Sequence, residues 1–161
     1  MGYTEKSISS GEQIIQKAII SKSVMVPTII IAAIIFLVLA IFGLWFVGLI
    51  LAAIIILPKY IKIKSTELSL TNKKILGKAG ILSTKVMDSP LNKINNISVQ
   101  QSLSGKICGY GKLVISTSSG NYNFDYIKQP DIFRNSIMAQ VDEYENEKIR
   151  RQAEELARAI K

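Results

Sequence analysis

The stretch SVMVPTIIIAAIIFLVLAIFGLWFVGLILAAIIILP, residues 23–58, decides the fold of this chain. It carries no Asp, Glu, Lys or Arg, and it is bounded by Lys22 and Lys59. As one straight helix it would extend about 54 Å, whereas the hydrocarbon core of a bilayer is about 30 Å thick and about 20 residues cross it. The stretch is therefore too long for one upright span and barely long enough for two.

The middle of this stretch holds residues that suit a chain reversal. Gly43 and Gly48 are its two glycines, and Trp45 is the only tryptophan of the chain. Glycine permits a sharp backbone reversal, and Trp favours the membrane–water interface. We predict a helical hairpin with arms at 25–41 and 45–58 that turns at these three residues. One long tilted span is the alternative.

Lysines flank the stretch on both sides. The preceding ones are Lys6, Lys17 and Lys22, and the following ones are Lys59, Lys62 and Lys64. Cationic residues near span ends are retained on the cytoplasmic side. A single span would place one cluster outside, whereas a hairpin leaves both inside. We therefore expect a multi-pass protein of the cell membrane, with the N-terminal segment 1–24 and the C-terminal part both cytoplasmic.

The excess positive charge lies directly after the spans. The chain has a net charge of +8, and residues 59–128 alone carry eleven Lys against three acidic residues. A basic domain beside an anionic inner leaflet gains about 1 kcal/mol per Lys held near the surface. Nucleic acid is the other usual partner of a basic domain. Because this domain adjoins a membrane segment, we expect anionic lipid headgroups as the partner and no nucleic acid.

The composition excludes several classes of enzyme. The chain has no His, so imidazole–metal sites and nucleophile–histidine pairs are impossible. Cys108 is the single cysteine, which excludes an intrachain disulfide and is most simply a small buried thiol. Adjacent carboxylates occur only at Asp142-Glu143 and Glu154-Glu155, where neighbours on a helix face different directions. We expect no catalysis, no metal and no cofactor.

From Lys59 the sequence changes to short alternating runs broken by Gly, Asn, Pro and Ser, which predict strands. Residues 61–64, 81–87 and 94–103 are three such runs. The clearest hairpin joins 112–117 to 122–127, and its second arm places Tyr122, Phe124 and Tyr126 on one face, expected to be core. Six or seven short strands imply an antiparallel barrel or an orthogonal sandwich.

A helix is predicted after Pro130, which suits a first helical turn. Its apolar residues recur at spacings of three and four, and the first stripe is expected to pack on the barrel: Phe133, Ile137, Val141 and Tyr144. A second, narrower stripe consists of Ile149, Ala153, Leu156 and Ile160. This stripe suits a coiled-coil-like contact with a partner or another subunit, and a solvated tail is the alternative.

Several ordered motifs carry a family resemblance. The run Ser65–Ile75, STELSLTNKKI, is similar to a pattern ST-E-x-x-LT-x-x-R-I, with Lys74 where Arg is usual. The further motifs are Gly11-Glu12, Gly80-Ile81-Leu82, Pro90 to Ile94, Gly105 to Gly111, Ser119-Gly120, and Pro130 with Phe133. In this order they resemble the bacterial pleckstrin-homology-like (PH-like) membrane proteins, in which two short spans precede a PH-like domain.

The resemblance implies a membrane α plus all-β fold. A transmembrane helical hairpin (25–58) is followed by a PH-like bent barrel of seven strands capped by a C-terminal helix (59–145) and by a charged helical extension (146–161). Basic residues around the first hairpin of eukaryotic PH domains hold lipid phosphates. The predicted headgroup contacts here are Lys73, Lys74 and Lys78, at a comparable place, with Lys59, Lys62 and Lys64 beside the membrane.

The expected function is a non-enzymatic, membrane-anchored adaptor or scaffold at the cytoplasmic face. It would contact anionic lipid and recruit a protein partner or self-assemble into a homo-oligomer. The alternative is an oligomeric pore or a transport-accessory subunit. The lack of any ionisable residue in 23–58 disfavours this alternative, because conducting paths normally have a polar or charged lining.

Overall fold

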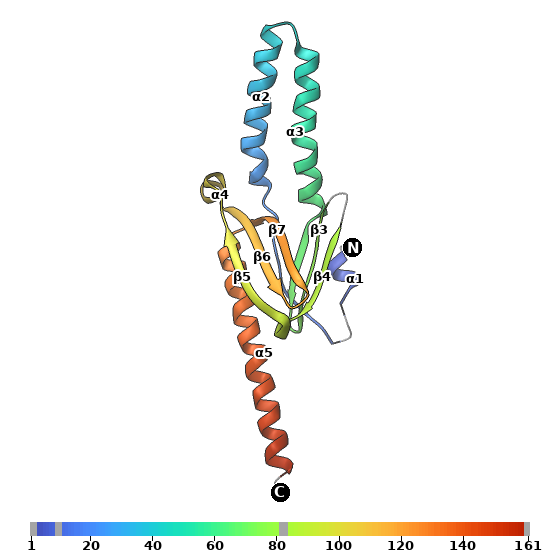
Figure 1. Ribbon diagram of the computed structural model, residues 1–161, viewed down its shortest axis with the longest axis vertical. Helices are drawn as coiled ribbons and strands as arrows, with labels where there is room; N and C mark the ends of the chain where they lie inside the picture. The colour runs from blue at the N-terminus through green and yellow to red at the C-terminus, as the bar shows by residue number, and fades with distance from the viewer. Residues whose placement is uncertain (1–2, 9–10, 81–83, 160–161) are drawn as a thin grey trace.

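The computed structural model describes residues 3–8, 11–80 and 84–159. A long pair of helices rises from one end of a small β-barrel, and a single helix leaves the opposite end (Figure 1). The start of the strand predicted at 81–87, part of the motif Gly80-Ile81-Leu82, and Ile160 of the second stripe lie outside the described residues.

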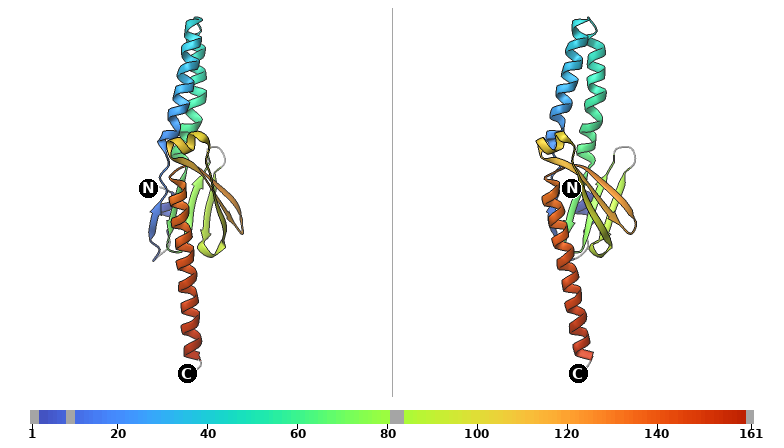
Figure 2. Two further views of the ribbon diagram at one scale, coloured as in Figure 1. Left: turned by 90° about the vertical axis from the view of Figure 1, so that its left-hand side faces the viewer. Right: turned by 60° about the vertical axis from the view of Figure 1, so that its left-hand side comes forward.

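The predicted hairpin consists of α2 (Met25–Ile41) and α3 (Trp45–Ser65), which lie side by side (Figures 1 and 2). A short turn η1 (Lys22–Val24) leads into α2. By length and composition, η1 together with α2 (Lys22–Ile41) and α3 are each long and apolar enough to cross a membrane. Only 17% of the most apolar window of the first and 6% of that of the second is buried, so most apolar side chains face outward.

α3 extends beyond the predicted arm and includes residues 61–64, for which a strand was predicted. That prediction was wrong because alternation over four residues is too short a signal to compete with continuation of an established helix. The extra turns bring Lys62 to the barrel, where its Nζ lies 2.7 Å from Oδ2 of Asp125. The hairpin is thereby joined to the barrel by a side-chain contact as well as by the chain.

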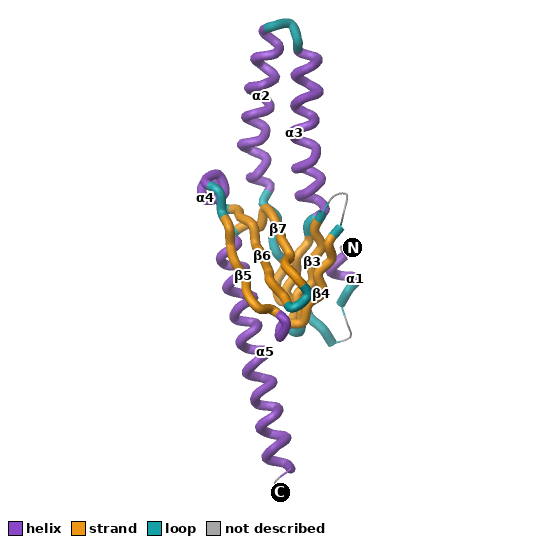
Figure 3. Tube along the Cα trace, viewed as in Figure 1, coloured by secondary structure: helices purple, strands orange, loops and turns teal. Residues whose placement is uncertain are grey.

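The barrel has seven strands in the described residues, arranged as two antiparallel sheets (Figures 1 and 3). The first sheet has the order β1 (Ile14–Lys17), β2 (Glu67–Thr71), β3 (Lys74–Ala79), β4 (Lys85–Pro90). The second has the order β5 (Ile94–Gln100), β6 (Tyr110–Thr117), β7 (Gly120–Lys128). The short turn η2 (Leu91–Lys93) makes the corner between them. This is the PH-like arrangement that the resemblance implied.

One of the seven strands comes from an unexpected part of the chain, because β1 precedes the hairpin. Ile14 pairs with Thr71 of β2, so the strands before and after the hairpin are neighbours in one sheet. Further on, Ile20 forms a bridge with Ile127 of β7, and the Ser21 N–H donates to the Tyr126 carbonyl at 2.6 Å. The N-terminal segment therefore closes the barrel between its two sheets.

The core lies between the sheets and is covered by α5 (Pro130–Ala159). Its buried residues are Leu68, Leu70, Ile75, Met87, Leu91, Ile97, Leu113, Ile115, Phe124, Ile127, Phe133 and Ile137. Gly77 has no side chain because the Phe124 ring occupies the space: a Cβ there would lie 2.4 Å from Phe124 Cζ. The first apolar stripe of α5 packs as its spacing predicted, and the rest of the helix projects beyond the barrel, away from the hairpin (Figure 1).

Two local details differ from the sequence predictions. In β7 the pairing shifts between Phe124 and Ile127, and Tyr126 has a positive φ of 64°, so Tyr126 leaves the core face and Ile127 takes its place. The strand predicted at 94–103 ends at Gln100 and is followed by a short helix, α4 (Leu103–Cys108). A bulge and a helix cap, neither of which alternation detects, account for these differences.

Candidate functional surface at the hairpin end of the barrel

The barrel has two distinct ends, which the strand register defines. We call the end from which α2 and α3 emerge the hairpin end; it includes the start of β2, the end of β3 and α4. The opposite end, with the β2–β3 turn, η2 and the β6–β7 turn, is the far end. Figure 3 shows α4 at the level where the hairpin begins, and α5 leaving past the far end.

Eight of the eleven lysines of residues 59–128, together with Lys22, lie at the hairpin end. The lysines placed there by the strand register and by α3, η1 and α4 are Lys22, Lys59, Lys62, Lys64, Lys78, Lys85, Lys106, Lys112 and Lys128. Acidic residues described at the same end include Glu67, Asp125 and Asp131. The surface that surrounds the base of the apolar hairpin is therefore strongly basic.

The three lysines predicted beside the membrane have three different environments. Lys59 Nζ donates to Thr28 Oγ1 at 2.6 Å and so links α3 to α2 at the base of the hairpin. Lys62 pairs with Asp125, and its Nζ lies 5.7 Å from the centroid of the Tyr126 ring. Lys64 is exposed. Of the three, Lys64 is the one that the fold leaves exposed, whereas Lys59 and Lys62 are half-buried.

The lysines of the first hairpin are divided between the two ends. Lys78 pairs with Glu67 in register and lies at the hairpin end, whereas Lys73 lies in the β2–β3 turn and Lys74 begins β3, both at the far end. Four residues of strand separate Lys78 from Lys74, a distance of about 13 Å at about 3.3 Å per residue. Lys73 and Lys74 therefore do not share a surface with the base of the hairpin.

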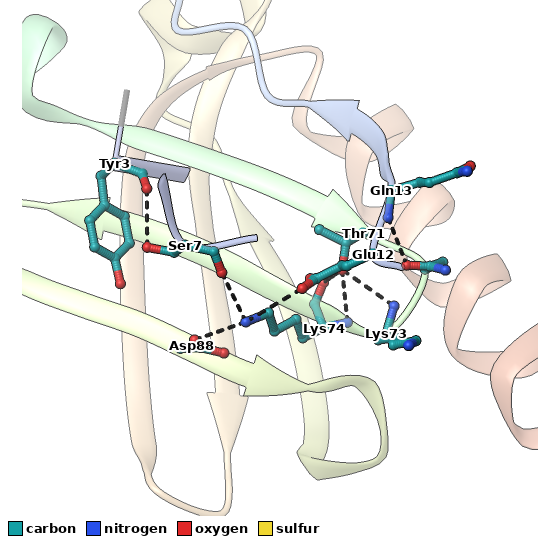
Figure 4. A network of polar contacts seen from close by, with 9 residues as sticks. Tyr3, Ser7, Glu12, Gln13, Thr71, Lys73, Lys74 and Asp88 are labelled. Atoms are coloured by element: carbon teal, nitrogen blue, oxygen red, sulfur yellow. Dashed lines mark hydrogen bonds and ion pairs between the residues drawn. The ribbon is translucent and has the colours of Figure 1, made fainter. Parts of the chain in front are cut away.

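Lys74 instead belongs to a polar network that holds the N-terminal segment against the barrel (Figure 4). Its Nζ lies 3.1 Å from Asp88 Oδ2, 3.6 Å from Glu12 Oε2 and 3.1 Å from the Ser7 carbonyl. Burial opposes the charge of Lys74, but the hydrogen bond and charge of Asp88 and the charge of Glu12 outweigh it and raise its pKa above the ordinary value. Lys74 thus joins the N-terminal segment to β4, and we call its contacts with Ser7, Glu12 and Asp88 the clasp.

Glu12 and Thr71 complete this clasp. The Thr71 side chain is fully buried, and its hydroxyl lies 2.7 Å from Glu12 Oε1 and accepts from the Lys74 N–H at 3.0 Å. Beside it, Asn72 Oδ1 accepts from the Gln13 N–H at 3.1 Å. The motif Gly11-Glu12 resembled the family pattern, but the role of Glu12 was missed because its partners lie 59 or more residues further along the chain.

An aromatic chain of contacts connects the base of α3 to α4. The Tyr126 ring, under the Lys62 ammonium, meets the Tyr110 ring edge to face at 6.2 Å. The Tyr110 hydroxyl in turn lies 3.0 Å from Ser104 Oγ on α4. Burial raises the pKa of Tyr126 above its ordinary value, the nearby Lys62 acting in the opposite sense. The sequence provided no sign of this arrangement because its members come from four separate elements.

The residues predicted for the hairpin turn differ in their roles. Gly43 has a φ of 74°, which glycine adopts without strain, and lies between the two helices. Trp45 is the first residue of α3 and is exposed. Gly48 lies inside α3 and is buried, where a Cβ would come within 3.2 Å of the Phe36 ring of α2. Gly48 is thus a helix–helix contact point rather than part of the turn.

A groove with a volume of about 870 Å³ lies at the far end of the barrel, between the edge strand β1 and α5. Ile15 and Lys73 lie on one wall, and Tyr144, Glu147 and Arg151 lie on the other. Beyond it, the second stripe of α5 is exposed: Ile149 is 62% and Leu156 is 64% exposed, and Ala153 is exposed as well. α5 is unbroken across the predicted boundary at 145–146.

The described residues hold no group of three or more His, Cys, Asp or Glu that could bind a metal ion. Cys108, expected to be a buried thiol, is half-buried at the end of α4. The chemistry concentrated on this barrel is therefore that of ammonium groups and apolar side chains at one end.

Comparison with known proteins identifies the family. The profile of a family described as Bacterial PH domain matches residues 22–156, and the chain belongs to this family. No curated protein matches it. Among solved structures it is similar to a DUF1696 family protein with a pleckstrin-homology domain from Shewanella loihica PV-4, with 15% identity and a TM-score of 0.33 over 49% of this chain and 69% of the other. The family assignment therefore rests on the sequence match.

Proposed function

We propose that this protein is a non-catalytic, membrane-tethered adaptor or scaffold. In this proposal α2 and α3 insert as a hairpin, and the hairpin end of the barrel rests on anionic headgroups. The surface at the far end then recruits a partner protein or another copy of the chain. The observation that carries the proposal is that the apolar hairpin and the lysine-rich surface lie at the same end of the barrel.

The dimensions of the hairpin suit a membrane anchor. The 17 residues of α2 extend about 26 Å and the 21 residues of α3 about 32 Å, against a hydrocarbon core of about 30 Å. A soluble protein rarely leaves so large an apolar surface exposed. Both helix ends that meet the barrel are flanked by lysines, which favours a cytoplasmic location for the barrel.

The pairing of β1 with β2 supports a topology in which both termini of the hairpin are on one side. β1 comes before the spans and β2 after them, and they can pair only if the chain returns to the side from which it entered. A single tilted span would separate these strands by the thickness of the bilayer. The barrel thus favours the hairpin over the single span independently of the lysines.

The headgroup contacts in this proposal are the exposed lysines of the hairpin end. The exposed ones are Lys22, Lys64, Lys85, Lys106 and Lys128, and Lys78 is half-buried beside them. Each is expected to contribute about 1 kcal/mol beside an anionic leaflet. Lys73 and Lys74, at the far end, are not part of the proposed lipid surface.

The test is a comparison of lysine reactivity in two bilayers. The full chain is reconstituted in nanodiscs of anionic or zwitterionic lipid, and acetylation of each lysine is followed by mass spectrometry. We expect the anionic lipid to slow acetylation at Lys64, Lys85 and Lys106 and to leave Lys73 and Lys93, at the far end, unchanged. Equal acetylation rates in the two lipids at the hairpin end would show that headgroup contact is absent.

The second stripe of α5 is proposed as the surface for a partner or for self-assembly. Ile149 and Leu156 are exposed on a helix that projects away from the membrane side, which places them where a soluble protein or a second copy can reach them. The mass of the detergent-solubilised chain is measured for the wild type and for Ile149→Asp with Leu156→Asp. A larger assembly that survives both substitutions would exclude self-assembly through α5.

A further inference from the structure

The short helix α4 presents an unusual apolar surface at the hairpin end. Ile107 is 86% exposed and Leu103 is 82% exposed, more than any other large apolar side chain described outside the hairpin. The two residues are four apart, so they lie on one face of the helix, and Lys106 lies beside them. Two of the six residues of α4 are therefore large apolar side chains held almost wholly in solvent.

This exposure is built into the fold. Ser102 caps the helix, its Oγ accepting from the Gly105 N–H at 3.1 Å, and Gly109 ends it in the left-handed conformation with a φ of 69°. Gly105 faces the barrel, and a Cβ there would lie 2.5 Å from the Tyr110 carbonyl oxygen. Ser104 is also hydrogen-bonded to the Tyr110 hydroxyl, and these contacts hold α4 on the barrel with Leu103 and Ile107 exposed.

α4 lies where the chain enters the hairpin. It packs beside η1, the turn that leads into α2, and the views in Figures 1 and 2 agree on this position. Lys22 on η1 and Lys106 on α4 are both exposed. An apolar face flanked by lysines, at the level where two apolar helices begin, matches the boundary between headgroups and acyl chains.

We propose that α4 is a membrane-inserting wedge, with Leu103 and Ile107 in the interfacial region of the same leaflet that surrounds the base of the hairpin. This inference rests on the proposed membrane anchoring. The occupant of the α4 surface is the lipid bilayer, because the surface lies beside η1, the turn that leads into the apolar hairpin, and its flanking charge complements anionic headgroups. The wedge gives the barrel a third attachment beside the two helices and so sets its tilt on the membrane.

The test uses the single cysteine of the chain. In a Cys108→Ala background, Ile107→Cys is labelled with the fluorophore NBD, and the full chain is reconstituted in liposomes of mixed anionic and zwitterionic lipid. Leu103→Cys is a second wedge position, and Ser119→Cys, an exposed position in the β6–β7 turn at the far end, is the control. Emission wavelength, quenching by aqueous iodide and quenching by shallow spin-labelled lipid are measured, and Trp45 fluorescence reports on the hairpin.

If the wedge exists, both α4 probes show blue-shifted emission, are quenched by the spin-labelled lipid and are shielded from iodide, while the Ser119 probe behaves in the opposite way. Iodide quenching of the α4 probes equal to that of the Ser119 probe, with Trp45 quenched by the lipid label, overturns the wedge and leaves the anchoring intact. Iodide access to the α4 probes together with loss of lipid quenching of Trp45 overturns both. Disulfide cross-linking between two unlabelled Ile107→Cys chains identifies a second copy as the occupant and also overturns the wedge.

Discussion

Substitution of Lys74 by Met tests whether the clasp holds the N-terminal segment to the barrel. The Glu12 side chain is 1% exposed and the Lys74 side chain 15% exposed, so the carboxylate lacks water to replace a lost ammonium. At 3.6 Å and an effective dielectric constant of about 20, the attraction between the two charges is about 4.5 kcal/mol. Desolvation offsets part of this attraction.

Removing one member of a buried ion pair costs about 3–5 kcal/mol, and because Lys74 keeps some contact with solvent we expect about 3 kcal/mol. Since about 1.4 kcal/mol corresponds to a factor of ten, amide protection in β1 and in the β2–β3 hairpin is expected to fall about a hundredfold. Hydrogen exchange of the full chain in detergent micelles, followed by mass spectrometry, measures this change peptide by peptide.

Lys73→Met is the matched control, because Lys73 precedes Lys74 directly, in the β2–β3 turn, but is exposed. We expect the control to retain wild-type protection in β1 and β2. If amide protection in these strands is equal in Lys74→Met and Lys73→Met, the clasp contributes nothing measurable and the reasoning from burial and distance is wrong. A loss restricted to β3 and β4 would show that Asp88, rather than Glu12, is the partner of Lys74 that matters.

Three further predictions follow from the packing and the charges. Gly77→Ala forces a Cβ against the Phe124 ring and is expected to destabilise the barrel by about 1–3 kcal/mol, measured as a lower melting temperature, with the neighbouring Lys78→Ala as a control that keeps the melting temperature. Lys62→Met removes the link to Asp125 and should broaden the distribution of distances between spin labels on α3 and β7; an unchanged distribution would show that the chain connection alone aligns the hairpin. Because the pKa of Lys74 is raised in the folded state, its contribution to the free energy of unfolding is fully present below the ordinary pKa of 10.5 and is lost as the pH rises through the higher folded pKa. Unfolding in urea should therefore become easier only in strong alkali. Lys74→Met should reduce this alkaline loss of stability.

The long-range parts of the fold explain where sequence reasoning succeeded and where it failed. The bounds predicted for the first arm, 25–41, coincide with α2, because an uncharged apolar run bounded by lysines is a signal contained within one segment. β1 was missed because four residues are too few to establish alternation, and its pairing partner follows only after both spans. α4 was missed although Ser102 and Gly109 flank it as caps, because the strand pattern before it seemed to continue to Leu103.

The candidate surface likewise combines one property that the sequence determines with another that only the fold determines. Composition located the positive charge in 59–128 correctly, since charge is a property of the sequence alone. Which lysines can contact headgroups depends on the partners that the fold brings to them. Asp125 pairs with Lys62, and Glu12 and Asp88 pair with Lys74. No local pattern distinguishes these two lysines from Lys64, which the fold leaves exposed.

The placement of β1 has a consequence for the biosynthesis of the protein. β1 leaves the ribosome before either apolar helix, and Glu12 must wait for Thr71, 59 residues later, before the clasp can form. In the proposed topology, α3 must cross the bilayer back to the side on which β1 lies. If it does not, β1 stays on the opposite side of the bilayer from the rest of its sheet. Completion of the barrel would then occur only in correctly inserted molecules, and the unclosed remainder would present an open sheet edge to proteases and chaperones. Folding of the barrel would thereby depend on correct insertion of the hairpin, and incorrectly inserted molecules would be recognised as unfolded.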